Sequence, residues 1–257
     1  MSYLDFAKEF MKQAGVIFKK YSRANKNTQY KEDTTPVTMA DLEINDLLIA
    51  MVQKYFPDHA VMGEEASDIK EAEYVWVCDP VDGTVPYSRN LSISTICLSL
   101  LKNGISMLGV IYDPIGEILY IWDGKQSTRN GEVVHVSSES DIKKSVVAIE
   151  CFPSAYYDFK KLHGALVDLE CKVLQLWSIW YPSSLVSSWE IIATIFPSNN
   201  IREYSSVKSI VEWAGGKVTD LFGNEQNYLW KVHGHLATNG VMHDFFVDLI
   251  KKNVDLS

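Results

Sequence analysis

Two carboxylates three residues apart follow an apolar run in the middle of the chain. Asp79 and Asp82 come directly after residues 74–78, and Gly83 and Thr84 stand next to them. Carboxylates that converge at the end of a strand provide oxygen ligands suited to Mg²⁺. Gly83 lets the backbone approach a ligand closely, and Thr84 offers a hydroxyl where a helix could start and bind an anion. A capped turn without any chemical role fits the same spacing, so the pattern alone leaves both interpretations open.

A second pair of acids follows another apolar segment. Glu64 and Glu65 come after Gly63 and the strand-like residues Val61 and Met62. Adjacent acids most often form a solvated surface. A second source of acids at a strand end nevertheless raises the expectation that both sets contribute to one site.

The composition is that of an ordinary globular protein and excludes several other classes. The chain has 257 residues, is 47% hydrophobic and carries a formal net charge of −9. The apolar content argues against disorder, and the acidic balance argues against binding to a nucleic-acid polymer or a membrane surface. With no secretory signal in the first residues and no apolar stretch long enough to span a bilayer, we expect a cytoplasmic protein. Four cysteines without a Cys-x-x-Cys pair favour packing in a reducing compartment: Cys78, Cys97, Cys151 and Cys171.

Helical periodicity dominates the first part of the chain. A first helix is expected because its apolar residues recur on one face, at Leu4, Ala7, Met11, Ala14 and Phe18. A second helix is expected to begin near Thr38 or Asp41, either of which can cap it, and to end before Pro57.

The middle of the chain predicts an antiparallel sheet. Short turns, including Asn103-Gly104, separate apolar β-rich runs at 74–78, 93–101, 107–112 and 118–122. From residue 146 onward strands and helices alternate, and one helix is expected around 185–196. We expect an α+β or mixed α/β fold forming a single domain over 1–257, with lobes over approximately 1–145 and 146–257.

Taken in order, these motifs resemble those of the inositol monophosphatase family, a group of Mg²⁺-dependent, lithium-sensitive phosphate monoesterases. The resemblance covers nearly the whole chain and is strongest at the Asp-Pro-Val-Asp-Gly-Thr element. Its other parts are Pro36–Asp41 read as Pro-Val-Thr-Met-Ala-Asp, Gly63-Glu64-Glu65, Gly109 to Pro114, Asn130-Gly131, Ala214-Gly215-Gly216 and Ala237 to Gly240. The resemblance implies a layered αβαβα sandwich of the inositol monophosphatase and fructose-bisphosphatase type. It also implies a homodimer.

The resemblance further implies a role for each matching residue. Glu64, Asp79 and the backbone carbonyl of Val81 would hold a first Mg²⁺. Asp79 and Asp82 would hold a second, and Glu64 would share a third, weaker one. Mn²⁺ could replace Mg²⁺.

The same resemblance assigns the catalytic and phosphate-binding groups. Thr84, Asp41 and Glu64 would orient and deprotonate the attacking water, and the backbone at Gly83 and Thr84 would hold the phosphate. Clustered cations are needed because a phosphate monoester and hydroxide are both anions.

Two stretches depart from the family pattern. Glu203 stands where the family carries its last metal-binding aspartate, a dozen residues before Gly215. It either ligates a metal with a different rotamer or is a surface acid that leaves the second metal site weakened. Ser183 and Ser184 are the nearest match to the family's substrate-binding turn before the preceding helix. A specificity for inositol phosphate is therefore not implied.

Several aromatic residues crowd that second stretch. Trp177, Trp180, Tyr181 and Trp189 could stack on a flat ring such as a nucleobase, but core packing is the favoured interpretation.

The main hypothesis is a metal-dependent phosphatase in which an activated water attacks a small sugar, inositol or nucleotide phosphate. A first alternative is an activity like that of a 3′(2′),5′-bisphosphate nucleotidase. A second is a diverged member with weakened catalysis and a binding or regulatory role. A glycosidase, which also uses paired carboxylates, fits the Gly-Thr turn less well.

Overall fold

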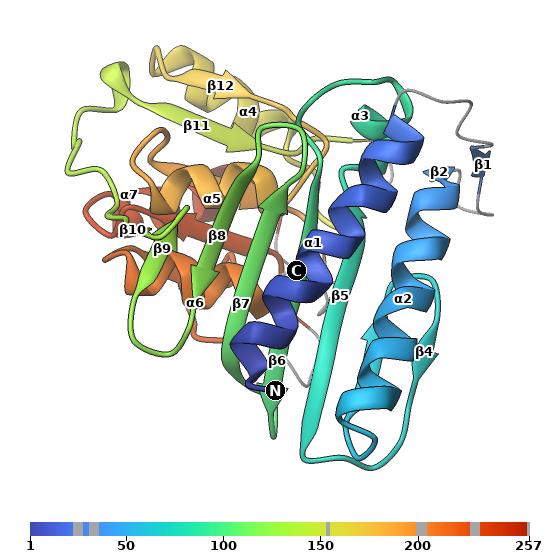
Figure 1. The fold of residues 1–257 in the computed structure, drawn as a ribbon. Coiled ribbons are helices and arrows are strands. Elements are labelled where there is room, and N and C mark those ends of the chain that lie inside the picture. The colour runs from blue at the N-terminus through green and yellow to red at the C-terminus, as the bar shows by residue number, and fades with distance from the viewer. Residues whose placement is uncertain (23–27, 31–35, 153–154, 199–204, 227–231, 256–257) are drawn as a thin grey trace.

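The computed structural model describes residues 1–22, 28–30, 36–152, 155–198, 205–226 and 232–255 (Figure 1). Within them, eight strands form the larger sheet in the order β10-β9-β8-β7-β6-β5-β3-β4. Their bounds are β3 Ala60–Gly63, β4 Ser67–Asp68, β5 Tyr74–Asp82, β6 Thr95–Lys102, β7 Ile105–Asp113, β8 Ile118–Trp122, β9 Ser127–Arg129 and β10 Glu132–Val133. The consecutive strands from β5 to β10 pair antiparallel, as the short turns predict, whereas β3 pairs with β5 in parallel.

The second sheet has five described strands in the order β12-β11-β13-β15-β14. They are β11 Val146–Ile149, β12 Lys172–Leu174, β13 Ala193–Phe196, β14 Lys217–Thr219 and β15 His235–Thr238. Their pairing is mixed, because β11 lies parallel to β12 and β13 while β15 runs antiparallel to both of its neighbours. A short ribbon, β1 Gln29–Tyr30 with β2 Pro36–Val37, stands apart from both sheets.

The helices cover the faces of these sheets in three sets. The described helices are α1 Tyr3–Ser22, α2 Met39–Tyr55, α3 Thr84–Ser88, α4 Lys160–Asp168, α5 Trp180–Ser187, α6 Ser205–Trp213 and α7 His243–Asn253, with a 3₁₀ turn at Ile142–Lys144. In Figure 1, α1 and α2 lie side by side across the front of the larger sheet.

Three separate apolar cores show how the layers are stacked. The first joins α1 and α2 to one face of the larger sheet, and the second joins the other face of that sheet to α5, α6 and the smaller sheet. The third joins the far face of the smaller sheet to α4 and α7. The order is therefore helix, sheet, helix, sheet, helix, which confirms the predicted αβαβα sandwich.

Strand β6 illustrates how the sequence specifies two buried faces. Ile96, Leu98 and Leu100 contribute to the core under α1 and α2, whereas Cys97 contributes to the core under α5 and α6. Successive side chains of a strand point to opposite faces, so a sheet covered by helices on both sides needs an almost continuous apolar run.

The predicted helix over 185–196 is wrong in its second half. Helix α5 ends at Ser187, and Ala193–Phe196 forms strand β13 in the middle of the smaller sheet. Trp189 takes a left-handed backbone angle, with φ of 69°, directly after the helix cap. The amide of Glu190 donates to the Leu185 carbonyl and that of Trp189 to the Val186 carbonyl, which is the Schellman pattern that closes a helix.

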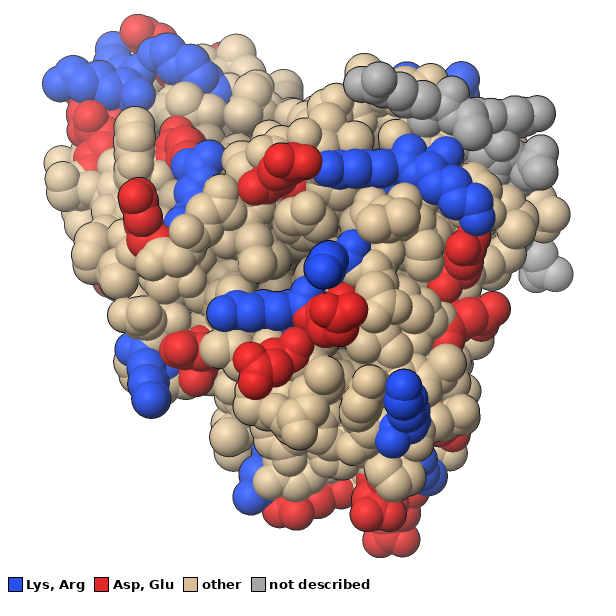
Figure 2. Space-filling model, in the orientation of Figure 1, with Lys and Arg blue, Asp and Glu red and all other residues tan. Residues whose placement is uncertain are grey.

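The surface carries charges of both signs. On the face shown in Figure 2, lysine and arginine side chains alternate with acidic ones over the larger sheet and its helices. Examples are the ion pairs from Lys19 to Glu117 and from Lys20 to Glu43. In the part of the chain described here, the helices are too short or too polar to cross a membrane.

A buried histidine at the start of α7 gives the fold a testable pH dependence. The two ring nitrogens of His243 each lie 3.0 Å from a threonine hydroxyl, Thr219 and Thr238. Burial lowers the pKa of His243 to about 4. The unfolded chain takes up the proton near pH 6.5, whereas the folded protein does not, so this contribution to stability is lost as the pH falls from about 6.5 toward 4.

We therefore expect wild type and His243→Gln to differ in the pH dependence of unfolding. Between pH 7 and pH 5 the wild-type free energy of unfolding should fall by about 2 kcal/mol more than that of the variant. Urea unfolding at both pH values measures this difference, in which the contributions of other titrating groups cancel. Parallel pH profiles for the two proteins would contradict the assignment.

Candidate active site

The end of strand β5 brings the two central aspartates onto one face of the sheet. Asp79 pairs with Cys97 and Asp82 with Thr95, so β5 contains one residue more than β6 across this interval. In a regular strand, residues three apart would point to opposite faces, but a bulge restores them to the same one. Both carboxylates consequently point to the side that α5 covers.

Both carboxylate oxygens of Asp82 accept hydrogen bonds from backbone amides at the start of α5. Its Oδ1 accepts from the amide of Ile179 at 2.9 Å, and its Oδ2 accepts from the amides of Trp180 and Tyr181 at 3.1 and 3.2 Å. The hydroxyls of Thr95 and Ser178 also donate to Oδ2. Asp82 is thus the cap of a helix nearly a hundred residues away. Burial raises its pKa, and these hydrogen bonds oppose the shift.

The groups around Asp79 make short local contacts. The Oδ1 atom of Asp79 accepts from the amide of Val81 at 3.1 Å, and the Thr84 hydroxyl donates to the Val81 carbonyl at 3.0 Å. Gly83 has φ of 78°, a left-handed angle that favours glycine, and precedes α3. In this structure Thr84 therefore contacts the carbonyl that the sequence assigns to a metal.

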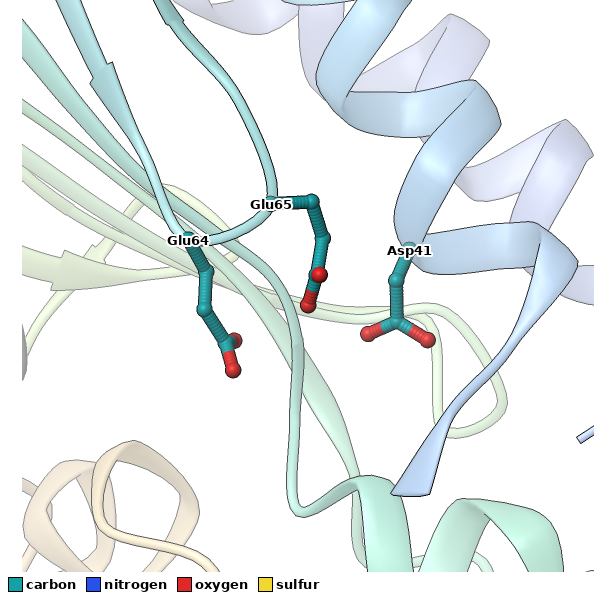
Figure 3. A group of neighbouring side chains, drawn as sticks. All are labelled: Asp41, Glu64 and Glu65. Carbon is teal, nitrogen blue, oxygen red and sulfur yellow. The ribbon is translucent and has the colours of Figure 1, made fainter. Parts of the chain in front are cut away.

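Three other carboxylates converge between α2 and the turn after β3 (Figure 3). Asp41, Glu64 and Glu65 each offer a carboxylate oxygen, and these oxygens lie within 4.8 Å of one another. Asp41 is buried in the first turn of α2, where its Oδ2 accepts from the hydroxyl and the amide of Thr38 at 2.6 and 2.7 Å.

The close approach of α2 to this turn depends on a glycine. A Cβ atom on Gly63 would lie 2.0 Å from the Asn45 Oδ1 atom and 2.4 Å from the Ala66 carbonyl oxygen. The Asn45 side chain also donates to the Ala66 carbonyl at 3.0 Å. Since Asn45 stands one turn after Asp41 on α2, this contact sets the distance between Asp41 and the two glutamates.

The residues of this cluster fit a divalent cation. The Asp41 Oδ1 atom is buried and makes no hydrogen bond within the described part of the chain. Burial, with a smaller contribution from the nearby charges of Glu64 and Glu65, raises the pKa of Asp41 to about 7 against the hydrogen bonds from Thr38. Three acidic oxygens that share one space favour a hard cation such as Mg²⁺.

The structure brings some of the predicted site residues into one tight group and leaves others outside it. Asp41 and Glu64 meet, Glu65 joins them, and Asp79 and Asp82 lie outside this three-carboxylate set. Glu203 lies outside the described residues, so its role as a metal ligand stays a prediction.

Ser183 and Ser184 lie inside α5 instead of at its start. Both are buried, and their hydroxyls donate to the carbonyls of Ile179 and Tyr181, one turn earlier in the same helix. They therefore present no hydroxyl to the acidic residues. Ser178, whose hydroxyl contacts Asp82, takes the position that sequence reasoning gave to them.

A second buried acid at this end of α5 was missed from the sequence. Glu150 directly follows β11, and its Oε1 accepts from the amides of Leu176 and Trp177 at 2.9 and 2.7 Å. Burial raises the pKa of Glu150 to about 7. An acid after an apolar strand is the same signal that pointed to Asp79, so the pattern was visible in the sequence.

The role of Asp82 as a helix cap can be separated from any role in catalysis. Asp82→Asn replaces one accepting oxygen with an amino group that faces several N–H donors. The free energy of unfolding should fall by about 2–4 kcal/mol in the presence of a chelator, because hydrogen bonds to a charged group are lost. Urea unfolding measures this loss.

Asp46→Asn, an exposed change on α2, is the matched control and should leave stability unchanged within about 0.5 kcal/mol. If Asp82→Asn unfolds like the wild type without metal, Asp82 does not carry the start of α5.

Comparison with known proteins places this geometry in a family. The sequence model of the Inositol monophosphatase family matches residues 2–255. The chain is 26% identical to the fructose-1,6-bisphosphatase/inositol-1-monophosphatase of Thermotoga maritima, covering 99% of this chain and 98% of that protein. It is 28% identical to the histidinol-phosphatase of Chlorobaculum parvum, covering 86% and 87%. The solved structure of the Thermotoga maritima IMPase superposes with a TM-score of 0.90 at 24% identity, covering 98% of each chain. The chain therefore belongs to the inositol monophosphatase family of phosphoric monoester hydrolases.

Proposed function

We propose that the protein is a Mg²⁺-dependent phosphatase that hydrolyses a small phosphorylated metabolite in the cluster around Asp41, Glu64 and Glu65. The observation that carries this proposal is the convergence of three carboxylates with a buried, unbonded oxygen on Asp41. A buried acid in this state is stabilised by a cation, and family membership supplies the reaction class.

The cation would be bound by named carboxylates. Asp41, Glu64 and Glu65 would hold Mg²⁺, with Mn²⁺ as a substitute, and Asp79 with the Val81 carbonyl would extend the site toward α3. Asp82 would join a second ion only by releasing part of its contact with α5. The cation supplies charge neutralisation for the phosphate and lowers the pKa of water.

The protein groups then orient water and ester. Thr38 holds Oδ2 of Asp41, so Oδ1 is the oxygen that would face the cation, and Glu64 would orient and deprotonate the attacking water. Thr84 at the start of α3 would donate to the phosphate once its hydroxyl leaves the Val81 carbonyl. In this proposal the backbone of Gly83 and Thr84 completes the anion site.

The substrate, the oligomeric state and the cellular location are proposed in more general terms. The relatives bear the names of a fructose-bisphosphatase/inositol-monophosphatase and a histidinol-phosphatase, so sugar, inositol and heterocyclic phosphates are all candidates. We further propose lithium sensitivity, a homodimer, a cytoplasmic location and one phosphatase domain over 1–257 with two lobes. A nucleotide 3′-phosphatase and a diverged regulatory member remain the alternatives.

Removing one carboxylate of the cluster tests the main proposal. Glu64→Gln should lower Mg²⁺-dependent phosphate release by about a hundredfold or more, since it removes a cation ligand and a group that orients water. Phosphate release from a panel of small esters and calorimetric Mg²⁺ titration give the two readouts. Glu71→Gln, an exposed change a few residues later, is the control and should retain both. Equal Mg²⁺ affinity in wild type and Glu64→Gln would exclude the cluster as the cation site.

Glu203 distinguishes an active enzyme from a diverged member. If the chain has lost turnover because glutamate replaces aspartate, the wild type should be nearly inactive and Glu203→Asp should raise its rate. We expect the opposite, namely a robust wild-type rate that Glu203→Asp changes by less than about tenfold. Steady-state kinetics with Mg²⁺ decides between them. A negligible wild-type rate that Glu203→Asp restores would favour the regulatory alternative.

A further inference from the structure

Trp177 adopts a backbone conformation that is costly for its residue type. Its φ is 56°, in the left-handed region that favours glycine, and it stands just before α5. A bulky side chain here signals a local constraint that the surroundings must impose. The side chain is 46% exposed, so burial of the indole does not account for the constraint.

Trp189 has the same left-handed conformation as Trp177, and its position at the end of a helix explains it. It is also a tryptophan with positive φ, at 69°, and is 69% exposed. Its amide and that of Glu190 close the end of α5 through the Schellman bonds to Val186 and Leu185. Trp177 stands before a helix, where no such motif applies.

The conformation of Trp177 is held from two sides. On one side Glu150, itself only 4% exposed, accepts from the Leu176 and Trp177 amides. On the other side the turn packs on Gly83, where an added Cβ would lie 3.2 Å from the Trp177 carbonyl oxygen and 3.1 Å from the Ser178 Cβ. Trp177 is therefore fixed directly against the turn that joins β5 to α3.

The indole is partly exposed, and the backbone of Trp177 lies against the Gly83 turn of the proposed phosphate site. Its ring lies 5.9 Å from that of Phe152, centroid to centroid, with 31° between the planes. Phe152 lies beside the indole, and part of the Trp177 side chain is exposed to solvent. Aromatic surfaces of this kind bind other flat rings by stacking.

We propose that Trp177 is a specificity-determining residue that selects phosphate esters whose alcohol carries a flat aromatic or heteroaromatic ring. This inference rests on the proposed function, because it assigns the alcohol side of the same site. Glu150 is then a positioning residue that acts by fixing Trp177.

The first test uses two esters that differ in ring flatness alone. Benzyl phosphate and cyclohexylmethyl phosphate are both esters of primary alcohols and have similar size. Wild type should prefer benzyl phosphate by about tenfold in kcat/KM, chiefly through KM. Trp177→Gly suits the left-handed backbone, so stability in urea should be retained, and the variant should reduce this preference to within about twofold.

The chain offers a matched control. Trp189→Gly removes the same side chain from the same backbone conformation at the other end of α5, and it should keep the full preference. Adenosine 5′-monophosphate against ribose 5-phosphate repeats the comparison with a ring farther from the ester. Wild type without any preference for a flat ring, or Trp177→Gly with an undiminished preference, would overturn the proposal.

A binding measurement separates this inference from the proposed function. Calorimetry with benzylphosphonate and methylphosphonate in Mg²⁺ needs no turnover. If wild type hydrolyses no ester, the proposed function fails, yet tighter binding of benzylphosphonate that Trp177→Gly abolishes would still support the aromatic surface. Equal affinities of the two phosphonates for wild type would exclude it.

The positioning role of Glu150 has its own readout. Glu150→Ala leaves the amides of Leu176 and Trp177 without an acceptor, and should reduce the preference for benzyl phosphate as Trp177→Gly does. Glu150→Gln keeps an accepting oxygen and should restore the preference. If both variants lose it equally, or both keep it, Glu150 does not act through Trp177.

Discussion

The contact between Asp82 and the start of α5 joins the two halves of this fold. Each sheet has an outer core with its own helices, so neither of those cores fixes how the sheets lie relative to each other. The carboxylate at the end of β5 accepts from consecutive amides at the start of α5, and α5 packs in the layer between the sheets. The first backbone N–H groups of a helix have no acceptor within the helix. At the start of α5, Asp82 of the larger sheet provides that acceptor.

This contact also affects which of the acidic residues are available to bind a cation. A carboxylate whose two oxygens already accept from helix amides and hydroxyls has little capacity left for a cation. Asp41 is in the opposite state, because Thr38 engages one oxygen and leaves the other buried. The cluster with Glu64 and Glu65 therefore holds the acids whose charge most requires a cation, and Gly63 keeps those glutamates close to α2.

The sequence predicted what local patterns determine and missed what depends on distant partners. The face of α1, the Thr38–Asp41 start of α2 and the Asn103-Gly104 turn are all local signals, and each is found in the structure. The helix predicted over 185–196 failed because an apolar run reads equally as helix or strand, and the left-handed Trp189 that separates them has no distinctive residue type.

The candidate site also contains residues of both kinds, those that belong to local motifs and those that depend on distant partners. Glu64 and Asp41 belong to short motifs, and their roles were predicted from the family resemblance. Ser178 and Glu150 act on partners 96 and 26 residues away, on Asp82 and on the Leu176 amide. Their residue types alone do not show which group they will meet.

In the proposed function, the short helix after Gly83 leaves much of the phosphate charge to be balanced by cations. Helix α3 spans only Thr84–Ser88, so few aligned peptide units contribute to its dipole. Pro86 lacks an amide hydrogen, and the Tyr87 amide already donates to the Gly83 carbonyl, so at most Gly83, Thr84 and Val85 can donate to a phosphate. Three neutral donors do not balance a dianion in a protein with a formal net charge of −9. In the proposed function that positive charge would come from cations held by the acidic cluster, which would explain why the carboxylates lie close to the phosphate site.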